Sequence, residues 1–263
     1  AARYQEAVRL DPQNAPAHSN LGLIYLCHNQ HEAALRCFAR AYELAPEIPG
    51  ALGKLTREWI ALEQFEQALA LLQDLYRKQP DRFEVLKCLV LVLRGMHRPE
   101  EALDYCLKAR ALNDTDVELL IELGVVLRDL GRLDEALESF NAAVALQPDS
   151  VLALWHRSLV YLLRHDFVRG WADYDLRVLS IDQPRRPQQY PQWDGSSLTD
   201  RILLVYAEQG LGDEIMFASC LPQVIAASRH CVVECSPKLE RLFRRSFPAA
   251  TVYATTLARD FPR

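Results

Sequence analysis

Four prolines, Pro12, Pro46, Pro80 and Pro148, follow a common 34-residue spacing, and Asp114 takes the one position on it that lacks proline. A repeat of this length is typical of a pair of helices that stacks on similar neighbours. Proline has no N–H group to donate and ends a helix readily. The spacing therefore predicts a stack of helical hairpins, with each proline just past the second helix of its hairpin.

The residues before each proline repeat as well. The second unit has Leu21, Gly22, Tyr25, Ala34, Phe38 and Ala41, and the fifth has Leu123, Gly124, Leu127, Ala136, Phe140 and Ala143. Steps of three and four residues put each set on one face of its helix. Gly22 is expected opposite Ala34, and the aromatic rings are expected to fill the space between hairpins. Residue size, spacing and period together make this pattern resemble the tetratricopeptide repeat.

The repeats are expected to occupy residues 1–178. They begin with a partial hairpin that lacks its first helix and an initiator methionine, so the sequence reads as part of a longer protein. Four full repeats follow. A sixth unit has Arg157 and Gly170 where leucine and alanine stand in the others, as expected of the atypical last repeat that caps a solenoid.

The composition excludes some functions. A net charge of −5, from 30 basic and 35 acidic residues, argues against a nucleic-acid-binding surface. No apolar run approaches the roughly 20 residues needed to span a bilayer. We therefore expect no nucleic-acid partner and no membrane span.

The cysteines favour a reducing environment. There are seven, an odd number, and none forms a C-x-x-C pair, so free thiols and a cytoplasmic location are expected. Cys106 takes the phenylalanine position of its repeat and is expected in the core. Cys27, His28 and His31 cluster at a hairpin turn, where a polar turn explains them better than a metal site does. No metal ion and no cofactor are predicted.

The first helix of each hairpin is expected to line the concave surface of the array. The side chains predicted there are Leu23, Leu26, Arg57, Ile60, Lys87, Leu91, Arg94, Val125, Arg128, Trp155 and Leu159. Such an apolar groove with interspersed cations would hold an extended or helical peptide with some acidic character. Alternatively, the apolar side chains pack inside a tight superhelix and the cations are only solvated. No pattern of lysines and asparagines for a peptide C-terminus is evident.

The sequence changes character after the repeats. A proline-rich linker is expected over 179–197, with Pro184, Pro187 and Pro191 favouring an extended tether. An α/β domain is expected over 198–263. Its predicted strands are 201–206, 231–235 and 250–254, with a helix beginning near Asp213 and another over 237–247. The order β-α-β-α-β predicts part of a Rossmann-like sheet, in which strand 201–206 is buried on both faces.

A glycine loop follows the first predicted strand. Gln209, Gly210 and Gly212 are candidate substrate-loop residues, because glycines let the backbone pass close to a ligand at the carboxyl edge of a parallel sheet. Ile215 stands where a dinucleotide fingerprint needs its third glycine, and no Walker lysine is present. The loop alone therefore does not identify a ligand.

Residues 170–222 resemble, in order, bacterial proteins that fuse tetratricopeptide repeats to a glycosyltransferase-like domain of the two-Rossmann (GT-B) type. The most specific part is 193–222, and the domain is similar to the heptosyltransferase group through Gly212 and Asp213. The resemblance implies that Asp213 is the general base that accepts the proton of the acceptor hydroxyl. The alternative is that Asp213 and Glu214 only complement the dipole at a helix start. Asn20 stands at the position of an asparagine that recurs in the repeats of O-GlcNAc transferase. The later repeats of this chain have Lys54, Cys88, Glu122 and His156 at that position, so the asparagine series is not reproduced.

The length limits the functional hypothesis. Residues 198–263 provide about two β-α units, whereas a GT-B enzyme needs two domains of on the order of 100 to 150 residues each. The partial sheet is expected to be poorly buried, with an open edge. We expect a nucleotide-sugar to bind only in the full-length protein, and the chain alone to be inactive.

Three functional hypotheses follow. In the first, the chain is a fragment of a glycosyltransferase whose repeats recruit a protein partner or acceptor and whose C-terminal domain supplies the acceptor-side half of the site. The second is a non-catalytic scaffold for protein–protein interaction. The third is a nucleotide-dependent enzyme of another class on a similar sheet.

Overall fold

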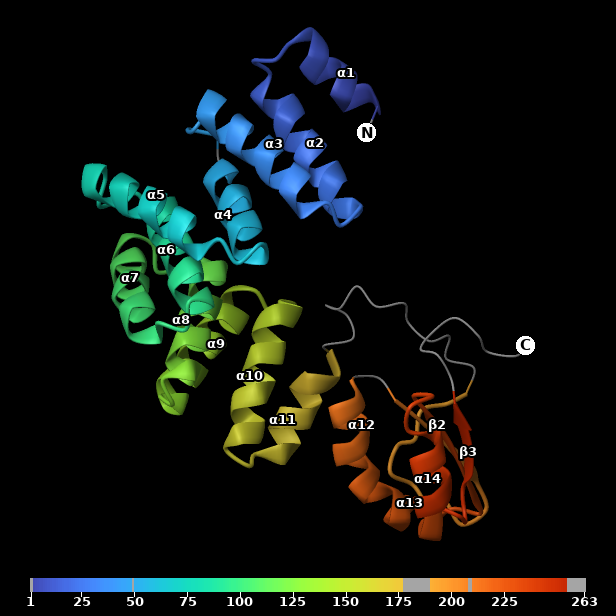
Figure 1. Ribbon diagram of the computed structural model, residues 1–263. Helices are drawn as coiled ribbons and strands as arrows, with labels where there is room; N and C mark the ends of the chain where they lie inside the picture. The colour runs from blue at the N-terminus through green and yellow to red at the C-terminus, as the bar shows by residue number, and fades with distance from the viewer. Residues whose placement is uncertain (1, 49, 177–189, 208–209, 255–263) are drawn as a thin grey trace. The chain divides into compact units, whose positions relative to one another are not determined.

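The computed structural model describes residues 2–48, 50–176, 190–207 and 210–254 (Figure 1). The chain divides into two compact units, Ala1–Ile181 and Asp182–Arg263. The first unit is helical and the second contains a sheet. Pro184 and Pro187 of the predicted linker lie outside the described residues.

The first unit is a succession of antiparallel helices (Figure 1). The helices are α1 (Ala2–Leu10), α2 (Ala15–Cys27), α3 (His31–Leu44), α4 (Ala51–Ala61), α5 (Phe65–Lys78), α6 (Phe83–Gly95), α7 (Pro99–Leu112), α8 (Val117–Asp129), α9 (Leu133–Leu146), α10 (Val151–Leu163) and α11 (Phe167–Tyr174). The predicted solenoid of helical hairpins is confirmed.

The prolines mark the ends of the second helices, as predicted. Pro46 lies two residues beyond Leu44, the last residue of α3, and Pro148 lies two residues beyond Leu146, the last residue of α9. Asp114 keeps the same distance from the end of α7. The 34-residue spacing is therefore the spacing of complete hairpins.

A second 34-residue series lies in the turn inside each hairpin. The residues of this series have a positive φ, between 54° and 73°, and are Asn29, Glu63, His97, Gly131 and His165. In the first of these turns the N–H of Gln30 donates to Tyr25 O (2.9 Å) and the N–H of Asn29 donates to Leu26 O (2.9 Å). This pair of bonds is the Schellman motif, which uses carbonyl groups that the end of a helix leaves unpaired.

Glycine and phenylalanine fit together within a hairpin. A Cβ atom added to Gly22 would lie 2.7 Å from Cε1 of Phe38, and one added to Gly124 would lie 2.5 Å from Cε1 of Phe140. Both rings are buried. The ring therefore lies over the glycine of its own hairpin, as well as filling the core between hairpins.

The last hairpin is atypical, as predicted. The helix α11 has only eight residues. Arg157 holds it to α10 by donating to both carboxylate oxygens of Asp173, at 2.7 and 3.1 Å. Gly170 is buried against Leu162, whose Cδ2 would lie 2.6 Å from an added Cβ. The atypical residues thus have packing roles in this repeat.

The second unit contains a parallel sheet with strand order β1-β2-β3. The elements are β1 (Ile202–Tyr206), α12 (Leu211–Phe217), η2 (Ala218–Cys220), α13 (Leu221–Ala227), β2 (His230–Cys235), α14 (Glu240–Ser246) and β3 (Thr251–Ala254). Leu204 pairs with Val232, which in turn pairs with Thr251. Core side chains of β2, including Val233, pack with Phe243 of α14 and Val252 of β3.

Two expectations about this unit need correction. Strand β1 is not buried on both faces, because Ile202 is 66% exposed and Tyr206 48% exposed. It has a strand neighbour on one side only among the described residues. The helix expected over 237–247 begins at Glu240 instead. A short 3₁₀ turn separates α12 from α13, in whose first turn Pro222 lies.

Candidate functional site

The first helices of successive hairpins lie side by side. Helix α6 contacts α4 and α8, and α8 also contacts α10. Helix α4 is joined to α2 by a hydrogen bond from Lys54 Nζ to Ser19 Oγ (3.0 Å). Side chains 34 residues apart on these helices therefore form rows across the array, which we call the groove.

Most of the apolar side chains predicted for the groove are half-buried. Leu23 is 41% exposed. The half-buried members are Leu26, Ile60, Leu91, Trp155 and Leu159. Val125 is an exception, because it is only 1% exposed and belongs to the core. The groove is thus apolar but has one apolar side chain fewer than the sequence predicted.

One carboxylate lies between two of the predicted groove cations. Arg57 of α4 donates to Glu118 Oε1 at 2.5 Å, and Lys87 of α6 donates to Glu118 Oε2 at 2.6 Å. Glu118 belongs to the first turn of α8. The charges of three neighbouring inner helices therefore meet at one side chain.

Lys87 has a second carboxylate partner. Its Nζ lies 3.1 Å from Oδ1 of Asp116, the N-cap residue of α8, whose side chain also accepts from the N–H of Leu119 at 2.7 Å. Burial opposes the charge of Lys87, but the hydrogen bonds and charges of Glu118 and Asp116 outweigh it and raise its pKa. Lys87 is therefore held as a cation.

Arg94 faces a largely buried carboxylate. Its Nε lies 3.0 Å from Oε2 of Glu122. Neither atom has a well-aligned hydrogen-bond partner among the described residues. Burial, helped by the charge of Glu118, raises the pKa of Glu122, although the charge of Arg94 opposes the shift. This contact is an ion pair without a properly directed hydrogen bond.

Arg128, the fourth predicted cation, lies between Asp129 and His156. Its Nη2 is 2.9 Å from Asp129 Oδ1 and its Nη1 is 3.4 Å from His156 Nδ1. The imidazole stacks on Phe140 and contacts Trp155. Burial and the nearby positive charge lower the pKa of His156 to about 4. The imidazole is therefore neutral at pH 7 and accepts from Arg128.

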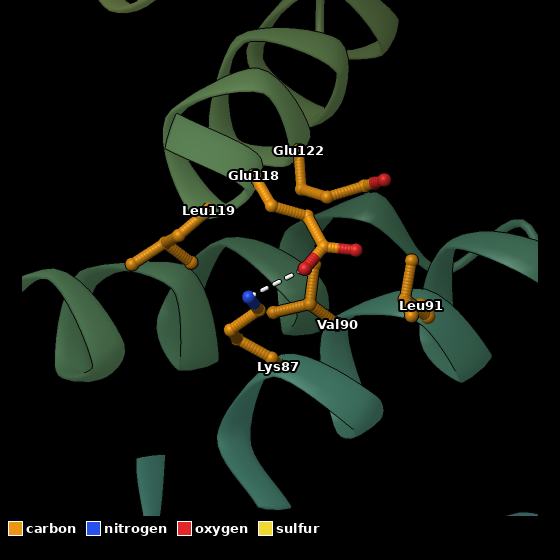
Figure 2. A pocket seen from close by; sticks show the side chains of 6 residues that line it. All are labelled: Lys87, Val90, Leu91, Glu118, Leu119 and Glu122. Carbon is orange, nitrogen blue, oxygen red and sulfur yellow. Dashed lines mark hydrogen bonds and ion pairs between the residues drawn. The ribbon is translucent and has the colours of Figure 1, made fainter. Parts of the chain in front are cut away.

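A small hollow opens beside Glu118 (Figure 2). It is lined by Lys87, Val90, Leu91, Glu118, Leu119 and Glu122. Its free volume is about 10 Å³, roughly the space of one water molecule. The side chains of Lys87 and Glu118, which both line it, are joined by a hydrogen bond (Figure 2).

The predicted catalytic loop lies at the carboxyl end of β1. Gly210 is the N-cap of α12, and Asp213 is the third residue of that helix and half-buried. A Cβ atom added to Gly212 would meet nothing within 4 Å. Gln209 lies outside the described residues. The loop therefore places Gly210, Gly212 and Asp213 together, at the helix start.

Glu214, the neighbour of Asp213, was not predicted as a site residue. It is 8% exposed and accepts hydrogen bonds from the backbone N–H of Ser236 (2.9 Å) and from the Ser236 hydroxyl. These bonds join the start of α12 to the loop that follows β2. Because the partner is 22 residues away, no local pattern indicates the contact.

Two kinds of feature are absent from the residues that the structure describes. No three His, Cys, Asp or Glu side chains gather there as metal ligands. No helix within these residues has the length and apolar composition needed to cross a bilayer.

Family models for tetratricopeptide repeats match most of the first unit. The N-terminal TPR repeats region of Psidin matches residues 57–169, a TPR repeat model matches 1–27, and a tetratricopeptide repeat model matches 15–48.

Two curated relatives have similar sequences. Protein FlbA of Caulobacter vibrioides is 27% identical in a match 267 positions long, which covers 95% of this chain and 44% of FlbA. Protein O-mannosyl-transferase TMTC1 of Homo sapiens is 27% identical over 182 residues, covering 68% of this chain and 20% of that protein. The chain thus spans less than half the length of these relatives.

Solved structures share the fold of the first unit. TTC0263, a thermophilic TPR protein of Thermus thermophilus, is 25% identical with a TM-score of 0.54, over 63% of this chain and 96% of that one. A chain of the APC/C hetero-tetramer Cut9–Hcn1 is 19% identical with a TM-score of 0.58. The match covers 67% of this chain and 35% of that one. With the 34-residue hairpins and the family matches, these findings make the first unit an array of tetratricopeptide repeats.

Proposed function

We propose that the repeat array is a scaffold that holds a segment of a partner protein in its groove. The observation that carries the proposal is the row of partly exposed apolar side chains on the inner helices, from Leu23 of α2 to Leu159 of α10, with ion pairs beside it. Apolar grooves between helices bind extended or helical segments through a few anchor side chains. The seven cysteines are free thiols, which fits the cytoplasmic location that we include in the proposal.

The partner segment that suits this groove has apolar anchors and at least one carboxylate. Arg57 and Lys87 are positioned for a carboxylate, which at present is that of Glu118. The alternative, in which the cations are only solvated, agrees less well with the ion pairs of the groove. A carboxylate oxygen of the protein lies within 3.0 Å of each of the four cations, Arg57, Lys87, Arg94 and Arg128.

A library of phage-displayed random peptides tests the scaffold. We expect the selected peptides to bind the chain, and to lose most of their affinity for Leu23→Lys and Leu91→Lys variants, because a buried ammonium group replaces an apolar contact. The matched control is Leu112→Lys at the end of α7, where the leucine is 46% exposed. Peptides that bind equally well to all variants would show that the groove is not the binding site.

We propose a second, enzymatic role for the second unit as the acceptor-side half of a sugar-transfer site. The supporting observation is that Asp213, Gly210 and Gly212 lie together at the carboxyl end of β1, where parallel sheets bind ligands. The name of one relative, Protein O-mannosyl-transferase TMTC1, is that of a glycosyltransferase. In this role Asp213 accepts the proton of the acceptor hydroxyl.

Transfer assays with a panel of nucleotide-sugars test this role in the whole protein. Asp213→Asn keeps the shape but removes the base, so it should lower transfer by about 100-fold or more. Ser219→Ala, on the exposed 3₁₀ turn after α12, is the control and should leave transfer unchanged. We expect the present chain alone to give no calorimetric signal with UDP- or ADP-sugars, and micromolar affinity would contradict that expectation.

A further inference from the structure

The groove contains a site for one carboxylate, and a side chain of the protein itself fills it. Arg57 and Lys87 approach Glu118 from two different helices, one on each carboxylate oxygen, at 2.5 and 2.6 Å. Charge-assisted bonds of this kind are short and directional. We propose that Glu118 is an internal competitor, which a carboxylate of the bound partner segment displaces from Arg57 and Lys87. This inference rests on the proposed scaffold function.

Two of the three side chains are exposed enough to exchange partners, whereas Lys87 is only 20% exposed. Glu118 is 47% exposed and Arg57 59% exposed. Ion pairs this accessible contribute little net free energy, since water screens them and both side chains lose rotamer freedom. A carboxylate delivered by a segment already anchored in the groove gains from its high local concentration.

Lys87 keeps its orientation when Glu118 leaves. Asp116 remains 3.1 Å from its ammonium group and is fixed by capping α8 through the N–H of Leu119. The two carboxylates thus have different roles, because Asp116 is part of the helix start and Glu118 is free to rotate away. A site with one fixed and one exchangeable carboxylate remains ready for a ligand.

The surroundings restrict the position of the incoming carboxylate. The hollow beside Glu118 has apolar walls from Val90, Leu91 and Leu119 but room for about one water only. The partner's carboxylate must therefore take the place of the Glu118 carboxylate, rather than occupy the hollow beside it. Glu122, one helical turn from Glu118, adds a like charge that disfavours a second acidic group there. The structure thus favours a segment with a single carboxylate flanked by apolar residues.

Two synthetic peptides test the inference by fluorescence anisotropy. The first has a single glutamate within a run of leucine and serine, and the second has glutamine in its place. For Glu118→Gln we expect at least a threefold tighter Kd for the glutamate peptide than in the unsubstituted chain, and no change for the glutamine peptide. Adding Arg57→Met to Glu118→Gln should remove the gain.

Glu84→Gln is the matched control. Glu84 lies one repeat earlier, at the same position in the first turn of α6, and contacts Gly50 and Arg82 rather than Arg57 or Lys87. Its replacement changes the net charge equally and should leave both Kd values unchanged. Circular dichroism would confirm that each variant is folded.

An unchanged or weaker Kd of Glu118→Gln for the glutamate peptide would overturn the inference, as would an equal gain with Glu84→Gln. If the glutamine peptide binds and responds to Leu91→Lys, the scaffold function stands even when the inference fails. If neither peptide binds any variant, the inference is overturned, and the scaffold function is decided by its own library selection.

Discussion

At the scale of single residues, two helical glycines should respond to alanine in opposite ways. An alanine at position 124 would place its Cβ 2.5 Å from the fully buried ring of Phe140, whereas a Cβ at position 53 meets nothing within 4 Å. Gly124→Ala should therefore lower the free energy of unfolding by about 1–3 kcal/mol through overpacking. Gly53→Ala should raise it by about 0.5–1 kcal/mol, because alanine favours the helix. Urea denaturation measures both, and equal effects of the same sign would contradict the packing argument.

His156 should make stability depend on pH. Its pKa is lowered to about 4 in the folded protein, below its ordinary value of 6.5, so the unfolded chain binds more protons between these two values. The contribution to stability is complete above pH 6.5 and is lost as the pH falls toward 4. We expect a loss of about 3 kcal/mol in the free energy of unfolding between pH 7 and pH 4.

The variant His156→Gln isolates this effect. Glutamine does not titrate and can still accept from Arg128, so the variant should lose less stability over the same pH range, as measured by urea denaturation. His28→Gln changes an exposed histidine and serves as the control. Parallel pH profiles for His156→Gln and the unsubstituted chain would contradict the assignment.

At the scale of elements, glycine should stabilise the turn inside those hairpins that have another residue at the positive-φ position. Glu63 has a φ of 56° at the position where Gly131 has 73°. A left-handed backbone costs a residue with a Cβ atom roughly 1 kcal/mol. Glu63→Gly should therefore stabilise the protein by about 0.5–1 kcal/mol, whereas Gly131→Ala should destabilise it by a similar amount. Asn29→Gly should gain less, because asparagine tolerates this conformation. Thermal unfolding that ranks these variants otherwise would contradict the turn argument.

The elements also show which features could be predicted from the sequence. The helix ends in the array could be predicted from prolines such as Pro46 and Pro148. The core could be predicted from repeated positions such as Phe38 and Phe140. Both predictions depend only on the local periodicity of the sequence. An open sheet edge was expected from the length of the domain, but its position at Ile202 could not be predicted, since it depends on which strand lies beside β1.

The sequence indicates on which helices the predicted groove cations lie, but not which carboxylates they pair with. Arg57 and Lys87 lie on the inner helices as expected. Their common partner Glu118 lies 61 residues from Arg57 and 31 from Lys87, and only the stacking of hairpins brings the three together. The bond between Glu214 and Ser236 was missed for the same reason.

At the scale of the whole molecule, the two units differ in how well their secondary structure is buried. In the first unit, inner helices such as α6 and α8 bury long rows of side chains, including Leu89 and Leu123. In the second unit, no residue of β1 is fully buried, and α12 buries only Glu214 among its side chains. Since burial of apolar surface is the main stabilising contribution, the units should differ in stability.

We therefore expect the second unit to unfold first in urea. Trp193 belongs to this unit, where its indole N–H donates to Ser196 O at 2.8 Å, whereas Trp59, Trp155 and Trp171 belong to the first. In a variant that keeps Trp193 alone, fluorescence should change at lower urea than far-ultraviolet circular dichroism, which follows the helices of the array. In a variant that keeps Trp155 alone, the two signals should change together. Coincident transitions in the Trp193 variant would mean that the two units unfold as one cooperative body, and the argument from burial would then be wrong.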